Sequence, residues 1–226
     1  MGVPTHDICA SRPESLFERY SWFYALCREV LFTDHTEEIA GAIAPMLNRS
    51  SRQVVLEIGC GPGFYSSKLA KRFPQIEVIG LDPSEGLLAR AKQKAARDHL
   101  TNCRFVRAHA QQLADFPEAA DFIIASRLFL ILVNRGVALE TIYTALKPNG
   151  LLFIAEPISP FRAALPLAFM RMLQSLTGSR DSTADFEDCR VLDKRQFANF
   201  VASQPWKDIR QWRDERYQYA LCEKPA

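Results

Sequence analysis

Apolar and polar residues alternate in a regular way between residues 53 and 157. Short apolar runs, rich in Val, Ile, Leu and Phe, lie at 53–58, 76–82, 103–108, 120–126 and 151–157. They are apolar on both faces, which is typical of strands that helices cover on both sides. The segments between them have the amphipathic pattern of helices, at 65–73, 84–100 and 136–146. This alternation predicts an α/β fold with a parallel sheet of βαβ units.

The ends of the chain follow a different pattern. Helical spacing of apolar residues predicts helices at 14–31 and 36–47, with Thr36 as the cap of the second. After residue 157 the alternation stops. A helix at 195–202 and two strands at 206–212 and 216–222 then predict a closing antiparallel hairpin.

These elements predict one domain over residues 1–226. We expect an N-terminal helical lid (1–50), a βαβ core (51–157), an insertion (158–192), and a C-terminal helix and hairpin (193–226). "LKPNG" before the fifth strand is expected to form a turn at Asn149-Gly150. The predicted fold is a Rossmann-like, doubly wound, seven-stranded sheet, mostly parallel, with the hairpin antiparallel.

Composition narrows the classes of partner. The 28 basic and 26 acidic residues give a net charge of +2, which does not favour a nucleic-acid binder held by bulk charge. The 6 cysteines form no CxxC pair or zinc-type cluster, so reduced thiols and no metal site are expected. No apolar run reaches about 18 residues, and the N-terminus lacks a basic region followed by an apolar one. A cytoplasmic protein is therefore expected.

A glycine-rich turn follows the first predicted strand, in "LEIGCGPGFYS". Parallel sheets bind ligands at the carboxyl ends of their strands, where this turn lies. The dinucleotide pattern GxGxxG would place its third glycine where Phe64 stands, and Glu57 before the turn would repel a pyrophosphate. An acid there suits an ammonium group instead. A nicotinamide oxidoreductase is therefore the less favoured alternative.

Four segments together resemble a known family. "LEIGCGPGFYS", "VIGLDPSEGLLARAK", "AHAQQLADF" and "LKPNGLLFIAEP" are similar, in this order, to the motifs of the class I S-adenosylmethionine-dependent methyltransferases. The resemblance covers about residues 54–157. It implies that the core binds S-adenosylmethionine and that the insertion lies on the substrate side.

The resemblance also implies roles for individual residues. Glu57 and the turn would hold the methionine end of the cofactor, Asp82 the ribose hydroxyls, and the segment after the third strand the adenine. His109 departs from the family, which usually has an acid there, but a neutral imidazole can accept a hydrogen bond through one nitrogen. The expected cofactor-binding residues are Glu57, Gly59, Gly61, Gly63, Asp82, Pro83, His109, Ala110, Gln111 and Ser126.

The catalytic residues are left open. Methyl transfer from a sulfonium is an in-line displacement that depends mainly on alignment, although an oxygen or carbon acceptor would also need a base. The candidates are Glu156 at the end of the fifth strand, His35, and Tyr20 and Tyr24 on the first helix. An ordinary helix cap for His35 and core packing for the tyrosines are the alternatives. "LFLILVN" after the fourth strand has no titratable group, which favours an apolar pocket.

The acceptor is expected to be a small molecule. Neither an Asn/Asp-Pro-Pro-aromatic motif nor a Pro-Cys nucleophile follows the fourth strand, which disfavours nucleic acid. Residues 161–176 are strongly apolar and favour a hydrophobic substrate, a peripheral membrane contact or a core helix. The N-terminal stretch resembles the ubiquinone/menaquinone C-methyltransferases.

The sequence thus predicts methyl transfer to a small, largely apolar metabolite at O, N, S or C. The alternative from another class is a protein that binds S-adenosylmethionine or S-adenosylhomocysteine without transferring a methyl group, as a partner or regulator. Acceptor identity and oligomeric state stay open.

Overall fold

A computed structural model describes residues 22, 25–26, 32–47, 52–115, 119–159 and 191–226, without the side chains of 111, 114 and 115. Tyr20, Tyr24 and the apolar segment 161–176 lie outside the described residues. Among the described residues, no helix has both the length and the apolar character that crossing a membrane requires.

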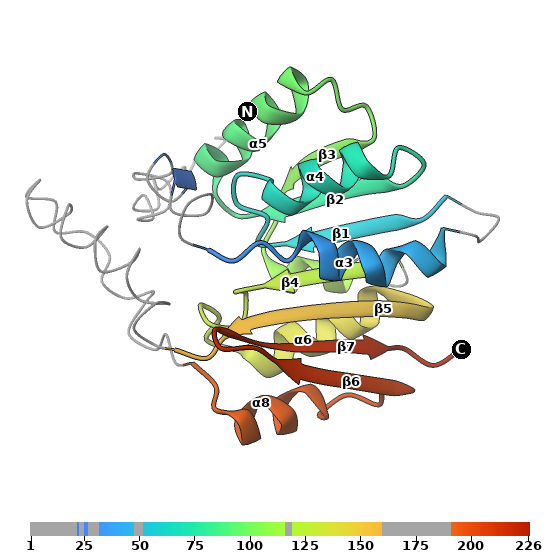
Figure 1. Ribbon diagram of the computed structural model, residues 1–226, viewed down its shortest axis with the longest axis vertical. Helices are drawn as coiled ribbons and strands as arrows, with labels where there is room; N and C mark the ends of the chain where they lie inside the picture. Colours follow the sequence, from blue (N-terminus) through green and yellow to red (C-terminus); the bar gives the residue numbers. More distant parts are fainter. Residues whose placement is uncertain (1–21, 23–24, 27–31, 48–51, 116–118, 160–190) are drawn as a thin grey trace, which may run out of the picture.

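A seven-stranded sheet forms the centre of the molecule, in the order β3-β2-β1-β4-β5-β7-β6 (Figure 1). Its strands are β1 (Val54–Ile58), β2 (Glu77–Asp82), β3 (Cys103–Arg107), β4 (Ala120–Ser126), β5 (Leu146–Pro157), β6 (Asp208–Arg213) and β7 (Tyr217–Glu223). β1 to β5 are parallel, whereas β7 runs antiparallel to both β5 and β6. The predicted fold is confirmed, including the hairpin.

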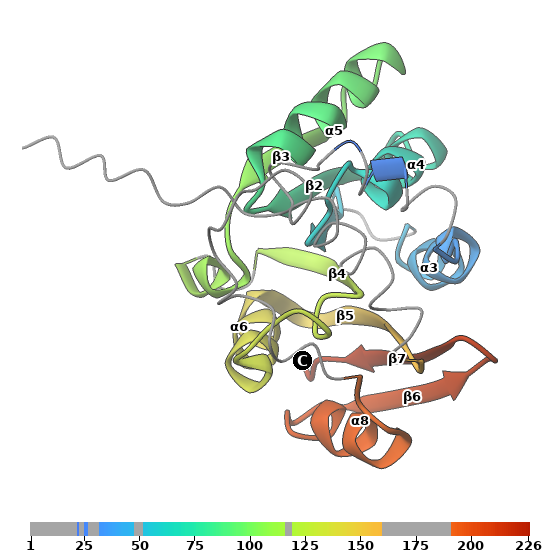
Figure 2. The ribbon, with the colours of Figure 1, turned by 90° about the vertical axis from the view of Figure 1, so that its left-hand side faces the viewer.

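Helices cover both faces of this sheet (Figures 1 and 2). On one face lie α3 (Thr36–Ile43), continued by the 3₁₀ turn η1 (Ala44–Met46), α4 (Phe64–Arg72) and α5 (Glu85–Arg97). On the other lie η2 (Ala110–Asp115), α6 (Arg135–Ala145) and α8 (Lys194–Val201). The strand residues alternate between the two cores: Val55 packs with α3 and α4, and Leu56 packs with α6. This arrangement explains why the strands are apolar on both parities.

The turn predicted at "LKPNG" is instead the first part of β5. Leu146 pairs with Ala120, and the next pair in register joins Leu151 to Phe122, so the five-residue step on β5 faces a two-residue step on β4. Asn149 has φ of 58° within this irregularity. The Asn-Gly signal therefore marks a bulge inside a strand, because the flanking residues stay paired with β4.

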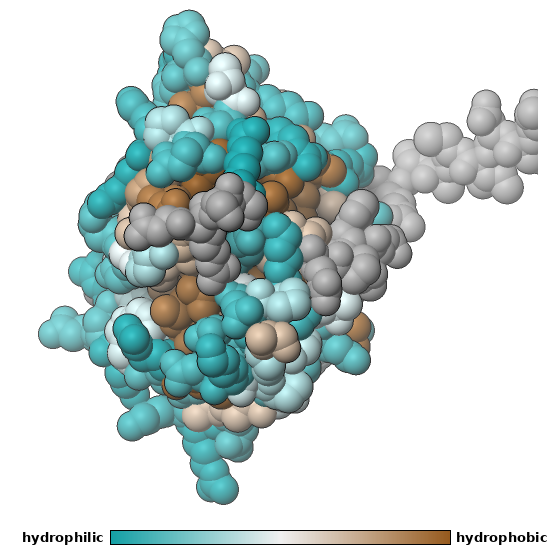
Figure 3. Space-filling model, turned by 90° about the vertical axis from the view of Figure 1, so that its right-hand side faces the viewer, coloured by the Kyte–Doolittle hydropathy of each residue, from teal (hydrophilic) through white to brown (hydrophobic). Residues whose placement is uncertain are grey.

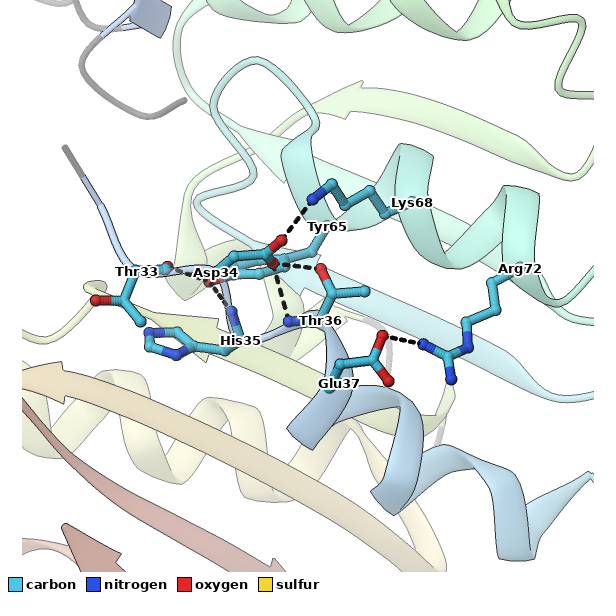
Figure 4. Close-up of polar contacts among 8 residues, drawn as sticks. All are labelled: Thr33, Asp34, His35, Thr36, Glu37, Tyr65, Lys68 and Arg72. Atoms are coloured by element: carbon cyan, nitrogen blue, oxygen red, sulfur yellow. Dashed lines mark hydrogen bonds and ion pairs between the residues drawn. The ribbon is translucent and has the colours of Figure 1, made fainter. Parts of the chain in front are cut away.

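The predicted caps have different outcomes. Ser84 caps α5 as expected, since its side chain accepts a hydrogen bond from the Leu87 amide at 3.2 Å. Thr36 does not cap α3: it is the first helical residue, and the N-cap position is His35. The Asp34 carboxylate accepts from the Thr36 amide at 3.0 Å and takes over the capping role (Figure 4).

Candidate active site

The glycine turn folds back against the end of β2. Gly59, Gly61 and Gly63 all have left-handed φ values, of 68°, 51° and 71°, which explains glycine at each of them. The amides of Gly59 and Cys60 donate to the Leu81 carbonyl at 2.8 and 3.0 Å. The turn therefore lies where β1 and β2 end together, at the edge of the sheet that faces the viewer in Figure 2.

Gly63 has a second reason to be glycine. A Cβ at this position would lie 2.7 Å from the Phe105 ring of β3 and 3.0 Å from Ala91 of α5. Gly63 lines neither of the cavities described below. Its position thus serves the packing of the α4 N-terminus against β3 and α5.

Asp82 is buried at the end of β2 and organises the turn. Its Oδ2 accepts from the Gly61 amide at 2.8 Å, and its Oδ1 accepts from the Ser84 amide at 2.9 Å. Each carboxylate oxygen can accept more than one hydrogen bond. Asp82 can therefore hold the turn and still accept hydroxyl groups from the cavity that it lines.

Two neighbouring cavities open at this edge of the sheet. The larger one combines apolar walls with Asp82 and His109, and its lining is Ile58, Gly59, Asp82, Pro83, Leu87, Ala108, His109, Ala110, Ser126, Arg127, Leu128, Ile131 and Leu132. The smaller one is lined by Glu57, Gly59, Cys60, Gly61, Pro62, Tyr65, Ser126 and Arg127. Gly59, Ser126 and Arg127 line both, so they mark the junction of the two cavities.

Glu57 lies at the floor of the smaller cavity. It is 4% exposed, and its Oε2 accepts from the Ser66 amide and hydroxyl at 2.7 and 2.5 Å. These contacts fix the carboxylate against the first turn of α4. A buried carboxylate held in this way can pair with an ammonium group in the smaller cavity.

The adenine-side prediction falls at the larger cavity. Pro83, His109 and Ala110 line it, and the His109 amide donates to the Gln112 side chain at 2.7 Å. The Gln111 side chain lies outside the described part of the chain. Nearly all of the cofactor-binding candidates from the sequence therefore lie at one edge of the sheet.

The comparisons with known proteins agree with this geometry. A family described as "Methyltransferase domain" matches residues 55–150. A putative S-adenosylmethionine-dependent methyltransferase from Methanococcus maripaludis superposes with a TM-score of 0.66 at 17% identity, covering 96% of this chain and 97% of that one. Residues 55–150 are thus similar to a methyltransferase domain, and the fold is that of solved methyltransferases.

The proteins that this chain resembles differ in their named substrates. Trans-aconitate 2-methyltransferase of an Acidovorax species is 31% identical over 161 residues, which are 70% of this chain and 58% of that protein. The chain thus spans about half the length of the curated relatives that it matches. Phosphoethanolamine N-methyltransferase 2 of Haemonchus contortus, solved with S-adenosyl-L-methionine, has a TM-score of 0.64 at 15% identity, covering 92% of this chain and 57% of that one.

Glu156 is buried at the end of β5 and lines neither cavity. One of its oxygens accepts from the Phe129 amide at 2.9 Å. Burial raises its pKa to about 7, although the Phe129 amide and the Arg127 and Arg135 charges act in the opposite direction. Through this hydrogen bond, Glu156 holds the β4–α6 segment, which is residues 127–134 between the two elements.

His35 is also buried, within a group of aromatic side chains. Its ring makes edge contacts with Tyr217 and Tyr219 at centroid distances of 4.6 and 5.2 Å. The Tyr219 hydroxyl donates its single proton to Asp214 at 2.6 Å, so its 3.4 Å contact with His35 Nδ1 requires a proton on that nitrogen. Burial acts to raise the pKa of Asp214, but this bond and two backbone amides outweigh it and lower the pKa.

His35 contacts the wall of the smaller cavity through Tyr65, whose ring stacks on the imidazole at a centroid distance of 6.2 Å. Its amide donates to the Tyr65 hydroxyl at 3.4 Å, and Tyr65 lines the smaller cavity. The imidazole lines neither cavity. The structure therefore separates both described catalytic candidates, His35 and Glu156, from the two cavities.

The candidate list from the sequence lacks several cavity residues, among them Tyr65 and Arg127. Tyr65 follows the glycine turn on α4, and Arg127 is the first residue after β4. Arg127 has φ of 57°, which is uncommon for a residue with a Cβ. A charged residue directly after a buried strand was the available signal for it.

Proposed function

We propose that the protein transfers the methyl group of S-adenosylmethionine to a small-molecule acceptor. The observation that carries this proposal is the pair of joined cavities, one holding Asp82 and the other Glu57. A ligand that spans both cavities needs a hydroxyl-bearing part at one end and a cationic part at the other. S-adenosylmethionine has both, and it supplies an electrophilic methyl group at the sulfonium between them.

The proposed roles follow from the lining of each cavity. In the larger cavity, Asp82 accepts from the ribose hydroxyls, while Pro83, His109 and Ala110 face the adenine. The other walls, from Leu87, Leu128, Ile131 and Leu132, suit a flat apolar ring system. In the smaller cavity, Glu57 pairs with the ammonium group, and Gly59 and Gly61 provide close backbone approach.

We assign neither His35 nor Glu156 as a base, because neither lines a cavity. The contribution of the chain to the reaction is then to hold the reacting groups in line and to keep water away. An acceptor that is already an anion at neutral pH would need no base at all.

The expectation of an apolar acceptor rests on residues 161–176, which lie outside the described residues, and on "LFLILVN" after β4. Leu128, Ile131 and Leu132 of the second stretch line the larger cavity. The relatives named trans-aconitate 2-methyltransferase carry the name of a tricarboxylate instead. We therefore propose a small organic metabolite, with apolar and carboxylate compounds as the two classes to be compared.

Calorimetry with S-adenosylhomocysteine tests the cofactor part of the proposal, and transfer of a labelled methyl group to a panel of both acceptor classes tests the reaction. Stoichiometric binding of S-adenosylhomocysteine is expected, with no binding of NADH. Folded protein that binds no S-adenosylhomocysteine would overturn the proposal. Binding without transfer to any acceptor would instead favour the non-transferase alternative.

A further inference from the structure

Arg127 occupies a special place at the junction of the two cavities. It directly follows Ser126, the last residue of β4, and its amide donates to the Ala155 carbonyl of β5 at 2.8 Å. Its left-handed backbone is energetically unfavourable for a residue with a Cβ. Glycine would fit this conformation with less strain, so an arginine here needs an explanation from its side chain.

The guanidinium of Arg127 is directed across the end of β5 toward β7. Its Nη1 donates to the Tyr217 hydroxyl at 3.3 Å, and Tyr217 pairs with Pro157 at the end of β5. Glu57 and Asp82, at the ends of β1 and β2, lie on the other side of β4. The guanidinium therefore extends from the junction of the two cavities toward the β5 and β7 side of the sheet.

An aromatic ring packs against this guanidinium. Its central carbon lies 3.8 Å from the centroid of the Phe32 ring. The segment after Phe32 is tied to α4, because Asp34 pairs with Lys68 of α4 at 2.5 Å (Figure 4). The segment then enters α3 at Thr36. A guanidinium that is stacked on one face and bonded through one nitrogen presents its remaining N–H groups as a fork, which matches a carboxylate.

The charge of Arg127 is not balanced by an ion pair among the described residues. Glu156 is close enough to interact electrostatically, but its carboxyl is buried and accepts from the Phe129 amide. With the proposed cofactor bound, a sulfonium and a guanidinium would share one cleft and repel each other. An anion between the two cations would turn this repulsion into attraction on both sides.

We propose that Arg127 binds a carboxylate of the methyl acceptor, so that the acceptor is a small organic acid held between Arg127 and the cofactor. This inference rests on the proposed function and names its substrate class. Tyr217 and Phe32 act as positioning residues for the guanidinium. Arg127 would thus determine specificity by favouring anions over neutral compounds of similar shape.

Calorimetry on the full chain saturated with S-adenosylhomocysteine tests this inference. The probes are trans-aconitate and fumarate, each compared with its neutral methyl ester. We expect at least one carboxylate to bind, with its ester at least ten-fold weaker. Arg127→Gln should weaken the carboxylate at least ten-fold and leave the affinity for S-adenosylhomocysteine within two-fold of the wild type.

Two further variants separate a binding role from a structural one. Tyr217→Phe should weaken the carboxylate by about two- to five-fold, since it removes one hydrogen bond that orients the guanidinium but does not itself contact the ligand. Arg210→Gln is the matched control: Arg210 is exposed on β6 and lines a separate hollow with Met46 and Asn149. That hollow lies toward the opposite edge of the sheet, where the surface is mostly hydrophilic with hydrophobic patches (Figure 3). This control should bind every probe as the wild type does.

Three outcomes would overturn the inference while the proposed function stands. The first is equal binding of carboxylates and esters, and the second is that no carboxylate binds the loaded protein. The third is that Arg127→Gln weakens S-adenosylhomocysteine as strongly as the carboxylate, which would assign Arg127 to the carboxylate of the cofactor itself. Failure of S-adenosylhomocysteine to bind the wild type would instead count against the proposed function.

Discussion

At the scale of single residues, two buried acids define the candidate site. Glu57 and Asp82 lie at or near the ends of adjacent strands. Glu57 accepts from a backbone amide of α4, and Asp82 accepts from two backbone amides, one of them in the glycine turn. These bonds fix the carboxylates before a ligand arrives. Preorganised acceptors of this kind lose little freedom on binding, which favours affinity.

The first prediction concerns Asp82. Asp82→Ala should weaken S-adenosylhomocysteine about 10- to 100-fold, because hydrogen bonds to a charged group contribute about 1.5–3 kcal/mol. Calorimetry measures the change. Asp98→Ala, which removes a carboxylate at the C-terminal end of α5 outside both cavities, is the control and should bind normally. An unchanged affinity in folded Asp82→Ala would contradict the proposed ribose contact.

The second prediction separates packing from ligand contact at a glycine. Gly63→Ala should destabilise the fold by about 1–3 kcal/mol, because its Cβ would overlap the Phe105 ring and its left-handed backbone disfavours alanine. Gly136→Ala on α6 is the matched control, since a Cβ there meets nothing within 4 Å. It should be neutral or stabilising by about 0.4–1 kcal/mol. Urea unfolding measures both, and equal stability of the two variants would refute the packing role.

At the scale of elements, the cavities depend on how the β4–α6 segment is held. Leu128, Ile131 and Leu132 of this segment line the larger cavity, and the Phe129 amide is bonded to Glu156 on β5. The carboxyl of Glu156 is thus a support for a cavity wall. Its raised pKa means that burial favours the neutral form, so this support carries an electrostatic cost at higher pH.

The third prediction follows from this cost. The pKa of Glu156 rises from 4.5 to about 7 on folding, so its contribution to stability is fully present below about pH 4.5 and is lost as the pH rises to about 7. Glu156→Gln removes this dependence and should still accept from the Phe129 amide. Its stability relative to the wild type should improve by up to about 3 kcal/mol between pH 4.5 and 8.

Urea unfolding of both proteins at a series of pH values measures the difference. The wild-type curve should fall relative to the variant curve mainly between pH 4.5 and 7. A difference that stays constant over this range would show that Glu156 does not change its proton binding on folding.

At the scale of the whole molecule, the sequence predicted the architecture well for a physical reason. Strands that are buried on both faces must be apolar throughout, and this pattern is local and readable. The same local logic failed at Asn149-Gly150, where pairing with β4 keeps a turn-like sequence inside a strand.

The site was predictable only in part, for a related reason. Glu57, Asp82 and the glycines belong to continuous motifs, so their order along the chain places them. His35 is different, because its partner Tyr219 lies 184 positions away, and only the folded sheet brings the two rings together. The contact of Arg127 with Tyr217 is likewise long-range, across 90 positions. Sequence patterns therefore located Glu57 and Asp82, which belong to motifs, and missed the contacts that depend on β7.

The last prediction uses the fold as a whole. Both cavities combine residues from the ends of β1 and β4, so they exist only in the folded sheet. A ligand that binds only the folded state at a concentration 100 times its Kd adds about 2.7 kcal/mol to stability. For a chain of this size, S-adenosylhomocysteine should then raise the Tm by about 5–10 °C. NADH should give no shift, and Asp82→Ala should show about half of the wild-type shift or less at the same concentration. An equal shift with NADH would contradict the assignment of the two cavities to a sulfonium cofactor.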